Sequence, residues 1–104
     1  MPIGTYRVKA LLRILGTVAK FKADIIAPIV VRLLREQREA RGLSMNAVAK
    51  RAGLSHTMIS RVEHELRRPT LDTLLRITEA MDVDLWPLIK KAEKSLQQTR
   101  KINS

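Results

Sequence analysis

The chain has 104 residues, and 20 lysines and arginines against 10 aspartates and glutamates give it a formal net charge of +10 at pH 7. This length suits one compact domain with short flanking segments and leaves little room for a large enzyme cleft. Because cysteine is absent, only two histidines are present and Tyr6, Phe21 and Trp86 are the only aromatic residues, we expect no disulfide, no protein-built metal site and no stacking platform for single-stranded nucleic acid.

The first predicted element is a basic amphipathic helix over residues 8–21. Its apolar side chains recur at helical spacing, as Val8, Leu11, Leu12, Leu15, Val18 and Ala19. This stripe can pack on the chain's own core, a second subunit, another protein or a membrane surface. We favour the first two, and the scarcity of bulky aromatic residues argues against the membrane. A break or kink is expected over residues 24–28, because proline disfavours helix in the residue before it.

Five further helices are predicted from periodicity, caps and terminators. Their expected bounds are about 28–41, 44–51, 55–64, 70–81 and from 85 onward, and residues beyond about 98 are expected to fray. Ser44, Ser55 and Thr70 stand where an N-cap side chain is favoured. Gly42 and Gly53 follow the first two of these helices, where a left-handed residue ends a helix at low cost. The chain is therefore expected to be all-α.

The helices at 44–51 and 55–64 are short, and only residues 52–54 join them. So tight a link predicts helices that cross steeply. Their shared apolar contact is expected from Val48, Ala49, Ala52, Ile59 and Val62. This is the mechanical description of a helix-turn-helix.

Residues 43–63 and 67–75, with "VAKRAGLS", "ISRVE" and "RPTLDTLLRI" at these spacings, closely resemble the Cro and phage-repressor proteins of the XRE family. The resemblance covers roughly residues 30–89. It implies a five-helix lambda-repressor-like DNA-binding domain, here with an extra N-terminal amphipathic helix. The expected organisation is a basic amphipathic extension at 1–28, the helix-turn-helix domain at 29–92 and a basic C-terminal tail at 93–104.

The resemblance also implies which residues meet DNA. The helix at 55–64 is expected to enter the major groove. Base contacts are expected from His56, Thr57, Ser60 and Arg61, and phosphate contacts from Ser44, Asn46, Ser55, Arg67 and Arg68. The fork of Arg61 suits the O6 and N7 acceptors of guanine, with a phosphate contact as the alternative. Met45 stands where the family often has glutamine, and Glu65 stands where it prefers glycine, which predicts a different or strained turn there.

Two conspicuous charges are expected to be structural. Arg38 and Glu63 align with a buried ion pair of many family members, which links the first domain helix to the recognition helix. The residues expected in the core are Leu34, Leu43, Leu54, Leu71, Leu74, Leu75, Ile77, Met81, Val83, Leu85 and Leu88.

The leading functional hypothesis is a sequence-specific regulator of transcription that binds double-stranded DNA as a homodimer on a palindromic operator, in the cytoplasm and with the nucleoid. Relatives commonly dimerise through the last helix, here with Trp86 and Ile89, and residues 8–21 are the competing surface. The alternative is a protein-interaction module, such as an antitoxin or an accessory subunit, that uses the same fold for docking, with residues 8–21 as a candidate surface for a protein partner. No catalytic constellation, cofactor or membrane span is expected.

Overall fold

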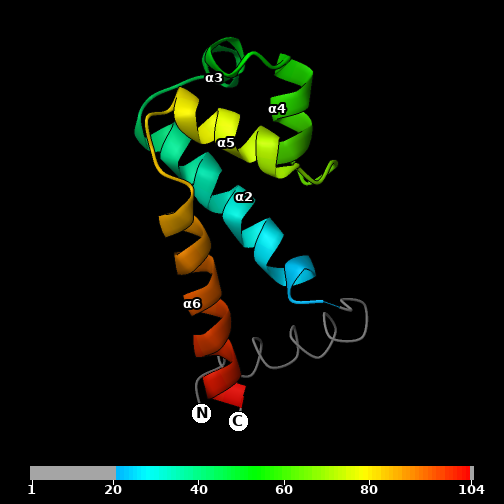
Figure 1. Cartoon of the computed structure of the whole chain (residues 1–104), viewed down its shortest axis with the longest axis vertical. Helices are drawn as coiled ribbons and strands as arrows, with labels where there is room; N and C mark the ends of the chain where they lie inside the picture. Colours follow the sequence, from blue (N-terminus) through cyan, green and yellow to red (C-terminus); the bar gives the residue numbers. More distant parts are fainter. Residues whose placement is uncertain (1–20, 104) are drawn as a thin grey trace.

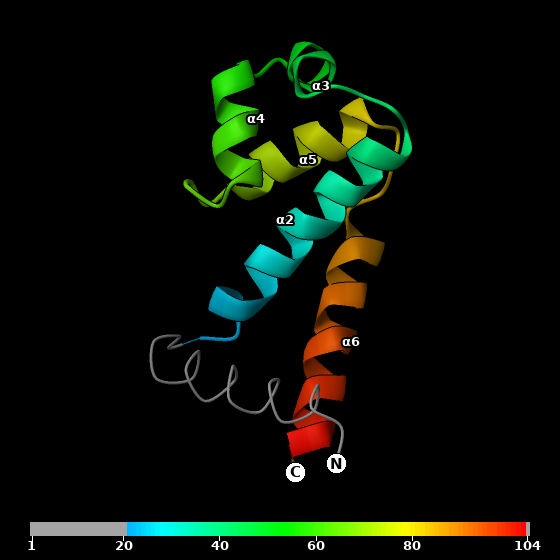
Figure 2. The same ribbon diagram turned by 180° about the vertical axis from the view of Figure 1, so that it is seen from behind.

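The computed structural model describes the backbone of residues 21–103 and the side chains of residues 21–98. These residues form five helices, α2 (Ala23–Ala40), α3 (Met45–Ala52), α4 (His56–Glu63), α5 (Leu71–Ala80) and α6 (Trp86–Asn103). In Figure 1, α3, α4 and α5 gather around the C-terminal half of α2, and α6 runs back along α2 and away from them. Figure 2 shows the same arrangement from behind. The described part of the chain is thus all-α, as predicted, whereas the expected helix at 8–21 lies almost entirely outside it.

Capping residues and glycines near the helix ends determine where the central helices begin and end. The hydroxyls of Ser44, Ser55 and Thr70 accept hydrogen bonds from the backbone N–H groups three residues later, at 3.0, 3.0 and 3.1 Å. Gly42 and Gly53 have φ angles of +65° and +68°, the left-handed region in which glycine carries no steric penalty. The predicted caps and terminators are therefore confirmed.

The predicted break over residues 24–28 is wrong, because α2 begins at Ala23 and contains Pro28 in its second turn. Proline at this position lacks the N–H that would bond the carbonyl of Asp24. Packing compensates for the loss, since Ile26 and Ile29 on the same helix lie against the hydrophobic core. At the C-terminal end of the chain, α6 extends to Asn103, whereas fraying was predicted beyond about residue 98.

A single hydrophobic core joins all five helices. Val48, Ile59 and Val62 are its largest fully buried side chains, so the contact between α3 and α4 lies at its centre. The cluster contains Val30, Leu33, Leu34, Val48, Ala49, Ile59, Ile77, Met81, Leu85, Leu88 and Ala92. The shared apolar contact predicted for the helix-turn-helix is thus present.

Two residues predicted for the core are instead exposed. Leu71 and Leu75 keep 63% and 48% of their surface in solvent, because α5 turns Thr73, Ile77 and Thr78 inward. Leucines at positions 71 and 75 are one turn apart and lie at the edge of the buried face of this helix, beside Thr78. Trp86, at the start of α6, is also 63% exposed.

No helix among the described residues is long and apolar enough to cross a membrane. The predicted boundaries at residues 28 and 92 both fall inside helices, α2 and α6 respectively.

Candidate nucleic-acid interface

The turn between α3 and α4 fixes the angle at which α4 is presented. Gly53 ends α3 in the left-handed conformation, and the N–H of Leu54 returns to the carbonyl of Ala49 at 2.9 Å. Ser55 follows in extended conformation and caps α4. Figure 1 shows α3 nearly end-on beside α4 seen from its side, so the two helices cross steeply. The inner face of α4 is buried, and its outer face is left to solvent.

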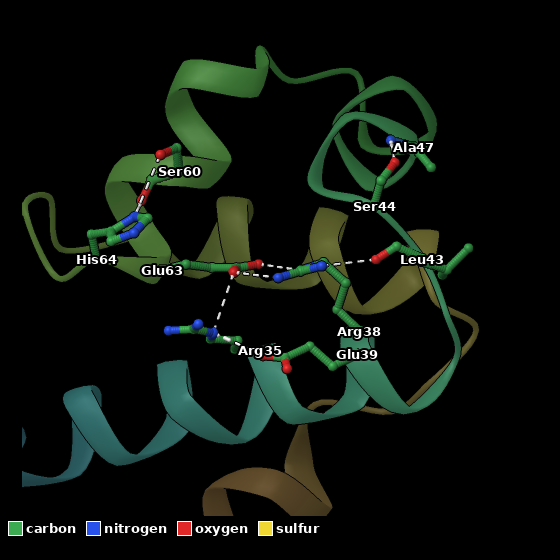
Figure 3. Close-up of polar contacts among 9 residues, drawn as sticks. All are labelled: Arg35, Arg38, Glu39, Leu43, Ser44, Ala47, Ser60, Glu63 and His64. Atoms are coloured by element: carbon green, nitrogen blue, oxygen red, sulfur yellow. Dashed lines mark hydrogen bonds and ion pairs between the residues drawn. The ribbon is translucent and has the colours of Figure 1, made fainter.

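The outer face of α4 carries the residues predicted to contact bases. His56, Thr57 and Arg61 are exposed. Among the residues that the structure describes, their side chains make no hydrogen bond or ion pair within the chain, which leaves their polar groups available to a ligand. Ser60 is half-buried, with its hydroxyl 3.4 Å from Nδ1 of His64 (Figure 3).

His64 is fixed by the backbone of its own helix. Its Nδ1 lies 2.7 Å from the carbonyl oxygen of Ser60, and a carbonyl only accepts, so Nδ1 carries the proton. The other ring nitrogen then accepts hydrogen bonds when the imidazole is neutral. His64 therefore closes the end of α4 rather than extending its outer face.

The residues predicted to contact phosphate lie at two helix starts and one loop. The hydroxyls of Ser44 and Ser55 accept from Ala47 and Met58, so each hydroxyl hydrogen remains available as a donor. Asn46 is exposed in the first turn of α3. The N-termini of α3 and α4 place positive partial charge beside these side chains. Such ends favour an anion over a cation.

The loop after α4 has the strained turn that Glu65 predicted. Glu65 has a φ angle of +58°, where glycine would avoid the steric cost. The N–H groups of Glu65 and Leu66 bond the carbonyls of Val62 and Arg61 at 3.1 and 2.8 Å, which is the Schellman pattern of a helix end. Leu66 is left 77% exposed at the tip.

The two arginines of this loop differ in their surroundings. Arg67 is exposed and has no ion pair among the described residues. Arg68 donates from Nη1 to Oδ1 of Asp24 in the first turn of α2, at 2.9 Å. Its partner is thus Asp24 and not the nearby Glu65.

Arg38 and Glu63 form the ion pair that links α2 to α4 (Figure 3). Nε and Nη2 of Arg38 donate to the two carboxylate oxygens of Glu63 at 2.6 and 2.9 Å, and Nη1 donates to the carbonyl of Leu43 at 2.8 Å. The side chains are 14% and 10% exposed. The hydrogen bond to Glu63 raises the pKa of Arg38 above its ordinary value, so this guanidinium is permanently charged. The pair faces the interior and leaves the outer face of α4 free.

Sequence reasoning missed two features of this surface. The Asp24–Arg68 pair joins residues 44 positions apart and has no local signal. The exposed leucine at the loop tip follows from the positive φ of Glu65, for which the missing glycine was the available clue. Residues 21–98 contain no group of three or more histidine, aspartate or glutamate side chains that could hold a metal ion.

Comparison with known proteins places the chain among helix-turn-helix proteins. The helix-turn-helix family model matches residues 34–85. An uncharacterized helix-turn-helix-type transcriptional regulator of Mycobacterium tuberculosis is 39% identical over 59 residues, which are 57% of this chain and 42% of that protein. A putative regulatory protein of the same type from Methanocaldococcus jannaschii has the same identity over 18% of its own length. The chain thus spans less than half of these curated relatives.

Two solved structures resemble the fold along nearly their whole length. The restriction-modification controller protein C.AhdI from Aeromonas hydrophila is 30% identical, with a TM-score of 0.55 over 61% of this chain and 94% of that protein. The controller protein C.Esp1396I has a TM-score of 0.61 over 71% of this chain and 95% of that protein. Its 20% identity supports the likeness of fold alone.

Proposed function

Because the chain belongs to the helix-turn-helix family of DNA-binding transcriptional regulators, we propose that it regulates a promoter by reading a specific duplex sequence with α4 in the major groove. The observation that supports this proposal most strongly is the division of α4 between a buried inner face and an outer face, where His56, Thr57 and Arg61 have no polar partner among the described residues. A helix about 12 Å long and 10–12 Å wide fits the major groove, which is about 12 Å wide. The likeness to C.AhdI, a restriction-modification controller protein, supports the same role.

We assign base reading to the outer face of α4. Arg61 carries a planar fork that can donate two hydrogen bonds to O6 and N7 of guanine. His56 and Thr57 at the start of the helix stand where a recognition helix approaches base edges. Ser60 contributes through its hydroxyl hydrogen, which remains available to a base because the protonated Nδ1 of His64 can only donate to Oγ. These four residues set the preferred sequence of one half-site.

Phosphate contacts position this helix without reading sequence. We assign them to the starts of α3 and α4, through Ser44, Asn46 and Ser55, and to Arg67 and Arg68 in the following loop. Both groups flank the outer face of α4. The DNA strand backbones on the two sides of the groove would therefore each be held.

The proposed assembly is a homodimer on a palindromic operator. Leu71 and Leu75 on α5 and Trp86 at the start of α6 expose large apolar side chains. Leu75 also lines two open depressions, one beside Arg51 and the other beside Leu85. Exposed apolar groups on a basic chain favour burial against a partner. A second copy seated there would present two α4 helices to half-sites about 34 Å apart.

Selection of binding sites from random duplexes tests the proposal. The expected result is an enriched sequence with two inverted half-sites whose centres lie about one DNA turn apart. The full-length protein should then bind that sequence far more tightly than unrelated duplex. If repeated selection enriched no sequence, the major-groove role of α4 would be refuted. Enrichment of one unpaired half-site would refute the dimer alone.

A further inference from the structure

The loop after α4 is tethered to the start of α2 by one ion pair. Arg68 Nη1 lies 2.9 Å from Asp24 Oδ1, and the two side chains are 56% and 31% exposed. Asp24 lies outside the stretch 34–85 that matches the family model. The first turn of α2 thus brings a carboxylate to a loop that carries Arg67 and Arg68 as well as Glu65.

The carboxylate of Asp24 is held in place without help from Arg68. Its second oxygen, Oδ2, accepts the backbone N–H of Phe21 at 3.1 Å. It also lies in the first turn of α2, where the helix dipole stabilises negative charge. A small cavity lined by Pro28, Val31 and Pro69 lies between α2 and the loop after α4. Asp24 therefore keeps a hydrogen bond that holds its carboxylate in position when Arg68 turns elsewhere.

We infer that Asp24 competes with DNA phosphate for Arg68 and so lowers the affinity of the protein for duplex DNA of any sequence. The inference rests on the proposed function. A guanidinium N–H donates to a carboxylate oxygen and to a phosphate oxygen alike, so a phosphate can replace Asp24 as the acceptor of Arg68. Exposed ion pairs add little stability, so the exchange is open to a phosphate brought close by the other contacts. When a phosphate replaces Asp24 as the acceptor of Arg68, the carboxylate of Asp24 faces the DNA backbone and Arg68 no longer offsets its charge.

The test measures binding of the full chain to a duplex of unrelated sequence at fixed salt, by fluorescence anisotropy. Asp24→Asn removes the charge but keeps an oxygen that can accept the N–H of Phe21. We expect about a two- to fivefold gain in affinity per subunit, the range that an exposed ion pair provides.

Two further variants isolate the role of Arg68. Glu93→Gln is the matched control, because Glu93 pairs with Lys22 at the start of α2 at 2.7 Å and the change adds the same charge. It should leave affinity nearly unchanged. In an Arg68→Ala background, Asp24→Asn should lose most of its effect. An equal gain from Glu93→Gln, or an undiminished gain without Arg68, would show general charge repulsion and overturn the inference.

A measurement on the unmodified protein guards against variants that fail to fold. The carbon NMR signal of the Asp24 carboxyl group should shift when duplex is added to saturation, as Arg68 leaves it. An unchanged signal, or an Asp24→Asn protein that binds no more tightly, overturns the inference alone. Failure of the unmodified protein to bind any duplex would instead overturn the proposed function.

Discussion

Removing one partner of the Arg38–Glu63 pair should destabilise the domain more than any surface change. Glu63→Ala leaves a guanidinium that cannot lose its proton, only 14% exposed and without acceptors for Nε and Nη2. An uncompensated buried charge of this kind costs about 3 kcal/mol or more. A domain of this size is stable by about 5–10 kcal/mol, so the change should remove a third or more of that free energy.

The two single substitutions should lower the free energy of unfolding by slightly different amounts. Arg38→Ala leaves the carboxylate of Glu63 with Arg35, whose Nε is already 4.0 Å away and half exposed. It also leaves the carbonyl of Leu43 without its donor. Because Arg35 can move closer and a carboxylate can take up a proton, we expect Arg38→Ala to cost somewhat less than Glu63→Ala.

Urea denaturation followed by circular dichroism measures these costs, and a double variant separates the pair from its surroundings. Arg38→Met with Glu63→Leu replaces the pair by apolar side chains of similar size, so its stability should stay within about 1 kcal/mol of the unmodified protein. Its operator affinity at low temperature should be unchanged, since the pair faces inward. Costs below 1 kcal/mol for both single changes, or a cost of about 3 kcal/mol or more in the double variant, would refute the reasoning.

Other changes test the surface. Arg61→Ala should cost about 1–3 kcal/mol of operator binding and relax one base position, whereas Arg67→Ala should weaken all sequences alike; uniform loss in both would make Arg61 a phosphate contact. Glu65→Gly should raise the free energy of unfolding by about 0.5–1 kcal/mol by relieving the positive φ, and equal stabilisation by Glu65→Gln would attribute the gain to charge. Leu75→Glu should shift sedimentation toward the monomer while Gln97→Glu, exposed on α6, should not. If a dimer neutralises six to eight phosphates, the slope of log affinity against log salt should be near −5 to −7, and a flat response would contradict electrostatic attachment.

The central helix-turn-helix could be predicted from the sequence because its signals act over three or four residues. Ser44 and Ser55 cap the helices that follow them, and Gly53 takes the left-handed turn that few other residues adopt cheaply. Such interactions depend on near neighbours and not on the rest of the fold. The role of Arg61 and its neighbours in choosing bases stays a prediction, since an exposed side chain does not by itself select a base.

The start of α2 depended on tertiary packing. Proline at position 28 predicted a break, yet the burial of neighbouring apolar residues outweighs one missing hydrogen bond. Helix α2 therefore begins five residues earlier than predicted, and these residues place Asp24 beside Arg68. No pattern in the sequence encodes a contact across 44 residues.

The sequence by itself determined where the central helices begin and end, and which stripes of each are apolar. It did not determine how far around each helix burial extends, because α5 carries one leucine, Leu74, packed on the core and two more at the edge of the same apolar face. Tertiary packing turned Ile77 inward and left Leu71 and Leu75 in solvent. Burial depends on which helices come together, and that choice belongs to the whole fold rather than to any local stretch of chain.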